Sequence, residues 1–352
     1  MVSFLRRFFG SPKAAPAPPN APIHAGVSRS SRAVSVVLAD APAEPSTSGG
    51  AEQPIELLQH LRARLDFALH HLDESLIGEH RRSPDVANLL RALRNDPLTG
   101  IRQLPVAAQR ALALLHGDAP TTLLVGLFEQ DPAITQGLLH QVNSVYYNAS
   151  GARVSSLVDA ITRMGRAGVQ GVVLQQSVAG MVSRPGGDLD AMAQQAWNHM
   201  VRVAPLTREI ASAFGVAPEQ AFLLGLLHDV GKLVVFDRIT ELRSSQRRTL
   251  VIDRQIVARA LRLLHEPLGG LVIQQWGLDS EIARAVGWHH RDPVPTTRDP
   301  LSEVIFVAEH VDLARERKEP IDLDQLWERG QLAGDKAAVA DALGHSSNEA
   351  AA

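Results

Sequence analysis

Apolar residues recur every three or four positions along most of this chain, and that spacing predicts an all-α protein. From Ile55 to Leu65, leucine returns at helical spacing, and the amphipathic pattern continues towards Ile77. Interleaved Ala, Leu and Arg favour helices over sheets throughout. Helices are expected at 55–77, 86–93, 106–116, 121–130, 131–147, 155–165, 169–182, 190–214, 252–264, 271–277, 281–288 and 301–315.

One stretch differs because it is apolar on every side. Residues 221–236 therefore predict a single helix packed inside the protein. His228 and Asp229 lie in its middle. A buried carboxylate is costly unless it is paired, hydrogen-bonded or bound to a metal, so we expect this pair to have specific partners.

Changes in composition divide the chain into four parts. Residues 1–54 are rich in Pro, Ala and Ser and predict a disordered leader. Residues 55–100 predict a helical N-terminal extension that leans on a main domain at 101–316. Residues 317–352 form a C-terminal extension, whose Ala-rich tail we expect to fray. The first ten residues are either a short amphipathic segment that contacts a membrane or a partner, or a mobile terminus. The mobile terminus is the favoured interpretation.

Charge and composition exclude several classes of protein. The net charge of -3 argues against a general nucleic-acid binder. The chain has no cysteine, which excludes disulfides and thiolate chemistry and fits a reducing compartment. No run reaches the roughly 18 apolar residues of a membrane span, and none is expected.

Histidines and acids on or at the ends of the predicted helices suggest a metal site. Imidazole and carboxylate are the usual ligands of iron, manganese, nickel or zinc. The order His, His-Asp, His, His-His, acid is what a mono- or di-metal site in an HD-type phosphohydrolase would use, where the ion activates water for attack on a phosphoester. The candidates are His199, His228, Asp229, His265, His289, His290 and Glu309.

Other polar residues have simpler interpretations. Lys232 could contact a phosphate, although a snorkelling surface lysine is favoured. Asn143 is expected to hydrogen-bond a neighbouring backbone. Pro205 predicts a kink or a break in its helix. We expect solvent-facing or core-edge positions, not ligand roles, for the remaining histidines of the extension: His60, His70, His71 and His80.

Several motifs occur in an order that resembles the HDOD family, the HD-related output domains of bacterial signalling proteins. They span about residues 104–314 and comprise Leu104-Pro105, Asp131-Pro132, Gln141-Val-Asn-Ser144 with Tyr146-Tyr147, Asp159-Ala-Ile161 with Gly165, and Gly225-Leu-Leu-His-Asp-Val-Gly-Lys232. The resemblance implies an all-helical HD-like bundle, cytoplasmic in bacteria, that regulates a protein partner and often lacks catalysis.

The chain departs from that family pattern in two ways. It has candidates at most ligand positions of the catalytic relatives, although Glu309 stands where an Asp would be expected. HD-GYP relatives, which cleave cyclic-di-GMP, carry Gly-Tyr-Pro after their His-His pair. Arg291-Asp-Pro293 follows here, so that activity is not expected.

Three functions remain open from the sequence. The favoured one is a non-catalytic signalling module that acts through protein contacts. The second is a metal-dependent phosphohydrolase acting on a nucleotide or phosphoester. Between them lies a sensor that binds metal or nucleotide without turnover.

Overall fold

The computed structural model describes residues 54–76, 78, 81, 83–98, 104–117, 119–149, 151–182, 189–245, 252–290 and 299–349. Residues 1–53 of the predicted leader, with the membrane or partner contact of the first ten, lie outside these described residues, as do His80 and the Arg291 to Pro293 segment.

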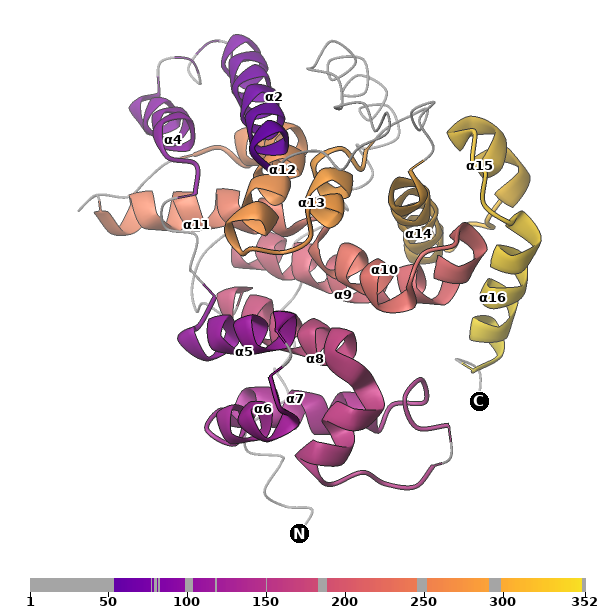
Figure 1. The fold of residues 1–352 in the computed structure, drawn as a ribbon. Helices are drawn as coiled ribbons and strands as arrows, with labels where there is room; N and C mark the ends of the chain where they lie inside the picture. The colour runs from indigo at the N-terminus through magenta and orange to yellow at the C-terminus, as the bar shows by residue number, and fades with distance from the viewer. Residues whose placement is uncertain are drawn as a thin grey trace, which may run out of the picture. The chain divides into compact units, whose positions relative to one another are not determined.

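The described residues contain helices and no strand, which confirms the all-α prediction (Figure 1). None of their helices combines the length and apolar character needed to cross a membrane. The helices are α2 (Pro54–Glu74), α4 (Pro84–Asn95), α5 (Val106–His116), α6 (Thr121–Phe128), α7 (Pro132–Val142), α8 (Leu157–Val182), α9 (Asp190–Ile210), the short 3-10 helix η3 (Ala211–Phe214), α10 (Pro218–Leu227), α11 (Val230–Ser245), α12 (Arg254–Gln275), α13 (Ser280–Gly287), α14 (Pro300–Arg317), α15 (Leu323–Gly330) and α16 (Lys336–Glu349).

The central stretch is two helices, so the prediction of a single helix over 221–236 is wrong. Helix α10 ends at Leu227, α11 begins at Val230, and His228 and Asp229 form the turn between them. The two helices pack on different partners, α10 mainly on α9 and α11 mainly on α12, so the chain must change direction between them (Figure 1). The turn is nevertheless buried as predicted: His228 and Asp229 are both 0% exposed.

Two helices continue through proline. Helix α9 continues past Pro205 without a break, while the alternative of a kink there stays a prediction. Helix α12 runs past Pro267, where two separate segments were expected. An interior proline removes a backbone hydrogen bond, so packing must compensate for its cost. In α12 every residue from Leu263 to Ile273 is buried. By contrast, Gly165 closes the first part of α8 as predicted, because its φ of 66° is accessible to glycine.

The C-terminal tail is helical over Lys336–Glu349, where the sequence analysis expected no helix, and its fraying stays a prediction. Helix α16 contacts α9 and η3. Its Val339 is fully buried and Leu343 is 8% exposed. This apolar contact stabilises a helix whose composition alone did not indicate one.

Helix α2 of the N-terminal extension packs on α12 and α13 (Figure 1). Its Leu61 lies so close to Gly270 and Gly287 that a Cβ atom on either glycine would come within 2.6 Å or 2.5 Å of the leucine Cδ2. Glycine at these two positions therefore allows α2 to approach both helices. The extension thus contributes to the same core as the helices that follow.

Candidate metal centre

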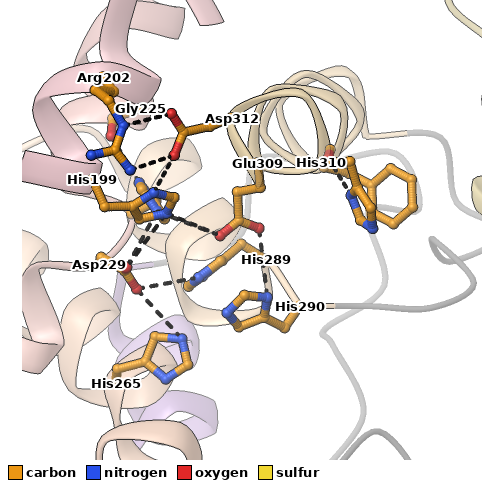
Figure 2. Close-up of polar contacts among 12 residues, drawn as sticks. His199, Arg202, Gly225, Asp229, His265, His289, His290, Glu309, His310 and Asp312 are labelled. Atoms are coloured by element: carbon orange, nitrogen blue, oxygen red, sulfur yellow. Dashed lines mark hydrogen bonds and ion pairs between the residues drawn. The ribbon is translucent and has the colours of Figure 1, made fainter. Parts of the chain in front are cut away.

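Five segments of the chain bring all seven predicted ligands together (Figure 2). His199 comes from α9, His228 and Asp229 from the α10–α11 turn, and His265 from α12. His289 and His290 follow the end of α13, and Glu309 comes from α14. We call these residues the seven-residue cluster. Their proximity is a finding of the structure, whereas their role as metal ligands stays a prediction.

The first group of ligand atoms consists of His199, His228 and Glu309, with Asp229 Oδ2 beside them. His228 Nε2 lies 3.2 Å from His199 Nε2 and 3.5 Å from Glu309 Oε1. His199 Nε2 lies 3.8 Å from Asp229 Oδ2. Ligand atoms around one ion with bonds of about 2.0–2.2 Å lie about 2.8–4.4 Å apart, from adjacent to opposite octahedral positions. These separations therefore fit a single shared ion.

The second group consists of Asp229, His265, His289 and His290. Asp229 Oδ1 lies 3.6 Å from His265 Nε2 and 3.9 Å from His289 Nε2. His290 Nδ1 lies 3.5 Å from Glu309 Oε2 and so borders the first group. The two oxygens of Asp229 consequently face different groups, which is the arrangement of a carboxylate that bridges two ions.

Unpaired polar atoms provide a test of whether a cation fits here. Among the described residues, Asp229 Oδ1, His289 Nε2 and both ring nitrogens of His265 are buried and have no hydrogen-bond partner. Leaving buried polar atoms unpaired is destabilising, typically by about 1–3 kcal/mol each. Three of these four atoms face one another within the second group, and imidazole nitrogens and carboxylate oxygens are transition-metal donors. The donor set therefore fits a divalent ion.

Backbone carbonyls orient two of the imidazoles. His228 Nδ1 donates to Gly225 O at 2.8 Å, and His289 Nδ1 donates to Val286 O at 2.7 Å. Each hydrogen bond places the proton on Nδ1 and leaves the Nε2 lone pair directed into the cluster. Both rings are thus prepared to bind a cation through Nε2.

Asp312 is a residue of the candidate site that the sequence analysis missed. Its Oδ2 lies 2.8 Å from His199 Nδ1, and Arg202 donates to both of its oxygens at 2.8 Å and 2.9 Å (Figure 2). A carboxylate behind a ligating histidine fixes the ring and raises its basicity. The available signal was its spacing, because Asp312 follows Glu309 by three residues and so shares its face of α14.

Glu266 and Arg64 were also missed. Glu266 Oε1 accepts a hydrogen bond from the His290 backbone N–H at 2.9 Å, and Arg64 Nη2 donates to Glu266 Oε2 at 2.9 Å. Glu266 could have been noticed as a second acid beside His265 in an apolar stretch. Arg64 is 202 positions away along the chain, and no local pattern points to it.

Charge within the cluster shifts several pKa values. Burial alone would raise the pKa of Asp229, but Lys232 and then His228 outweigh it and hold this pKa well below its usual range. Burial alone would lower the pKa of His199, but its hydrogen bond to Asp312 and the nearby carboxylates of Glu309 and Asp229 raise it to about 9. The metal-free protein therefore carries His199 as an imidazolium at neutral pH.

Lys232 forms an ion pair with Asp229 Oδ2, and its side chain is 24% exposed. The structure thus places its ammonium at the cluster instead of extending it over the surface. Whether it also contacts a phosphate stays a prediction.

One edge of the cluster is open to solvent. The side chains of His228, Asp229 and His289 are 0% exposed and that of His265 is 2% exposed, so they form the floor. His290 is 44% exposed, which makes it the most accessible member. We call His290 and the 24% exposed Lys232 the open edge of the cluster.

The other histidines of the extension that the structure describes do not belong to the cluster. His60 Nδ1 contacts Glu56 O at 2.9 Å, while His70 and His71 lie beside Glu74. Asn143 has the predicted backbone role: it donates to Leu139 O and Val154 O and accepts from Val154 N.

The HDOD domain model matches residues 101–292, more than half of the 352-residue chain. The chain belongs to the HDOD family. Three residues at or beside the candidate centre lie outside the matched HDOD segment: Arg64 precedes it, and Glu309 and Asp312 follow it. The candidate centre of this HDOD protein is therefore completed by helices on both sides of the match.

Two solved structures share the fold. An HDOD domain protein of unknown function from Geobacter sulfurreducens has a TM-score of 0.51 and 22% identity, covering 75% of this chain and 95% of that one. A candidate metal-dependent phosphohydrolase from Shewanella amazonensis has a TM-score of 0.53 and 16% identity, covering 73% and 96%. Among curated proteins, ribonuclease Y 2 of Levilactobacillus brevis is 27% identical over 147 residues, 41% of this chain. The match spans only 23% of that ribonuclease.

The pKa of His199 predicts opposite effects of pH on stability and on metal binding. Because the folded value of about 9 exceeds the ordinary 6.5, the imidazolium stabilises the metal-free protein fully below pH 6.5, and this contribution is lost as pH rises through 9. A metal ligand must be deprotonated, so metal affinity should rise over the same interval.

Thermal unfolding of chelator-treated protein between pH 6.5 and 9 tests the first effect, and metal titration tests the second. Asp312→Asn is the matched control, because it removes the carboxylate that hydrogen-bonds His199 Nδ1. The fall in unfolding temperature should be smaller in that variant. Identical pH profiles for the two proteins would contradict the role assigned to His199.

Proposed function

We propose that this chain is a regulatory HDOD module whose seven-residue cluster binds two divalent metal ions. The bridging position of Asp229 carries the proposal, since its two oxygens face separate groups of imidazoles. Iron, manganese, nickel and zinc are the metals that suit this mixture of imidazole and carboxylate. His199, His228 and Glu309 would hold one ion, and His265, His289 and His290 the other.

A phosphate-bearing ligand, such as a nucleotide or another phosphoester, is the ligand class we propose for the open edge. Bound divalent ions would polarise a phosphoryl oxygen and lower the pKa of bound water. Lys232 would add a positive charge on the same side, where it pairs with Asp229. The buried floor of His228, His265 and His289 excludes bulk water from behind such a ligand.

In the first candidate function, the ligand is bound without turnover and the module signals to a protein partner through its helix faces. The second candidate is hydrolysis of the phosphoester. The gathering of seven candidate ligands in one cluster and the solvent exposure of His290 favour this second candidate. In that case Lys232 would hold the phosphate in place, and Asp312 would keep His199 oriented by accepting from its Nδ1.

Metal analysis of the purified full-length protein tests the proposal. We expect two ions per chain after loading with Mn²⁺ or Zn²⁺, and micromolar or tighter binding by calorimetry. Folded wild-type protein that takes up no ion would overturn the metal centre.

Two probes separate the candidate functions once the protein is loaded. Inorganic phosphate in a calorimetric titration reports binding, and bis(p-nitrophenyl) phosphate reports hydrolysis. Lys232→Met should weaken phosphate binding, whereas Lys336→Met, which alters an exposed lysine paired with Asp324, should not. Binding without release of p-nitrophenol supports the sensor, and release that requires metal supports the hydrolase.

A further inference from the structure

A buried ion pair connects the N-terminal helix α2 to the second group of the cluster. Arg64 Nη2 donates to Glu266 Oε2 at 2.9 Å, and the two side chains are only 6% and 1% exposed. The other oxygen of the same carboxylate accepts from the His290 backbone N–H at 2.9 Å and lies 4.0 Å from His289 Nδ1. A continuous polar path therefore runs from α2 to the His289–His290 segment.

Packing reinforces this path at neighbouring positions. The Arg64 guanidinium carbon lies 5.4 Å from the ring centroid of Trp288, which directly precedes His289. One turn earlier on α2, Leu61 fits against Gly270 of α12 and Gly287 of α13. These two helices carry or precede the imidazoles of the second group. A shift of α2 therefore acts on both at once.

Glu266 depends on Arg64 for its position. A buried carboxylate without its cation is strongly unfavourable in the interior, so it tends to move towards water. That movement takes Glu266 Oε1 away from the His290 N–H and weakens the hydrogen bond between them. No such dependence applies to His199 or His228, whose orienting acceptors are Asp312 and Gly225.

We propose that Arg64 is a positioning residue that holds the second group in shape through Glu266 and the His290 N–H, so that the placement of α2 controls metal affinity at that group. The part of this inference that concerns metal rests on the proposed function. The extension is thereby a regulatory element of the centre, because any partner that displaces α2 changes how tightly His265, His289 and His290 bind their ion.

The first test measures backbone hydrogen exchange in the full-length protein without metal, so it does not depend on the proposed function. In Arg64→Met, exchange of the His290 N–H should accelerate at least tenfold, with the Gly225–Asp229 segment unchanged. Arg64→Lys should restore part of the protection, since lysine keeps the charge. Arg62→Met replaces an exposed arginine on the same helix and should leave both segments at wild-type rates.

The second test measures metal affinity by calorimetry with Zn²⁺. Removing the partner of a group that orients a metal ligand typically weakens binding about 10- to 100-fold, and we expect this loss for one of the two ions only. If wild-type protein binds no ion, the proposed function fails, while the exchange experiment still decides the role of Arg64.

A double variant shows whether faster exchange comes from the lost contact or only from unfolding of the protein. Replacing a buried ion pair by apolar residues of similar volume is often neutral for stability, so Arg64→Met with Glu266→Met should remain folded. It should nevertheless show fast exchange at His290, because no acceptor faces its N–H. Wild-type protection of His290 in folded Arg64→Met or in the folded double variant would overturn the proposal.

Discussion

Asp229→Asn should leave a folded protein that binds neither metal ion. Asparagine keeps the shape of the side chain but removes the negative charge and offers only one oxygen. In the structure the two oxygens of Asp229 face different groups, at 3.8 Å from His199 Nε2 and 3.6 Å from His265 Nε2. Loss of this bridge therefore affects both groups, unlike loss of any single histidine.

Asp229→Asn should weaken metal binding more than the loss of a residue that only hydrogen-bonds a metal ligand. Altering such a residue weakens metal binding about 10- to 100-fold, so a bridging ligand should cost more than about 100-fold. Metal content after dialysis against a weak chelator should fall from two ions to none. Asp66→Asn, a change of the same chemistry at an exposed position on α2, should retain both ions.

Histidine variants separate a bridge from an ordinary ligand. His265→Ala should lose one ion and retain the other, because His265 belongs to the second group alone. If Asp229→Asn also lost a single ion, or none while remaining folded, the bridging role would be wrong. Circular dichroism and thermal unfolding establish that each variant is folded before metal is measured.

The candidate ligands could be predicted from the sequence because each is an unusual residue in its local setting. His228 and Asp229 interrupt an apolar stretch, and the other imidazoles fall on or at the ends of helical patterns. Such signals need no knowledge of the fold. Asp312 and Glu266 offered only weak local signals, their spacing from Glu309 and their place beside His265, and Arg64 offered none, because all three make their contacts between helices that are distant in the sequence.

Helix boundaries set by a local residue were predicted, whereas boundaries set by packing against distant helices were missed. The closure of a helix at Gly165 was predicted because a positive φ favours glycine. The turn at His228 and Asp229 was missed because it arises from the packing of α10 and α11 on different helices. The helix at the C-terminus was missed for a similar reason, since burial of Val339 against distant elements stabilises it.

Gly231→Ala should be among the most destabilising single changes in the protein. A Cβ at this position would lie 1.9 Å from His265 O and 2.6 Å from Gly269 N. Both are backbone atoms of α12, so no side-chain rotation can relieve the clash. Helix α11 must move away from α12, and we expect a loss of about 3 kcal/mol in the free energy of unfolding. The same movement displaces His265, so binding at the second group should also weaken.

Two matched glycine variants show whether the close helix contact causes this loss. Gly269→Ala would bring a Cβ to 2.7 Å from Val286 Cγ1, a side-chain atom that can move, so its cost should be smaller. Gly180→Ala has no atom within 4 Å of the added Cβ and lies inside α8, so it should stabilise the protein by about 0.5–1 kcal/mol. Urea unfolding of the three variants should therefore rank them Gly180→Ala, Gly269→Ala, Gly231→Ala in decreasing stability. If Gly231→Ala were as stable as Gly269→Ala, α11 and α12 could not be in such close contact, and the placement of His265 beside Asp229 would lose its structural basis.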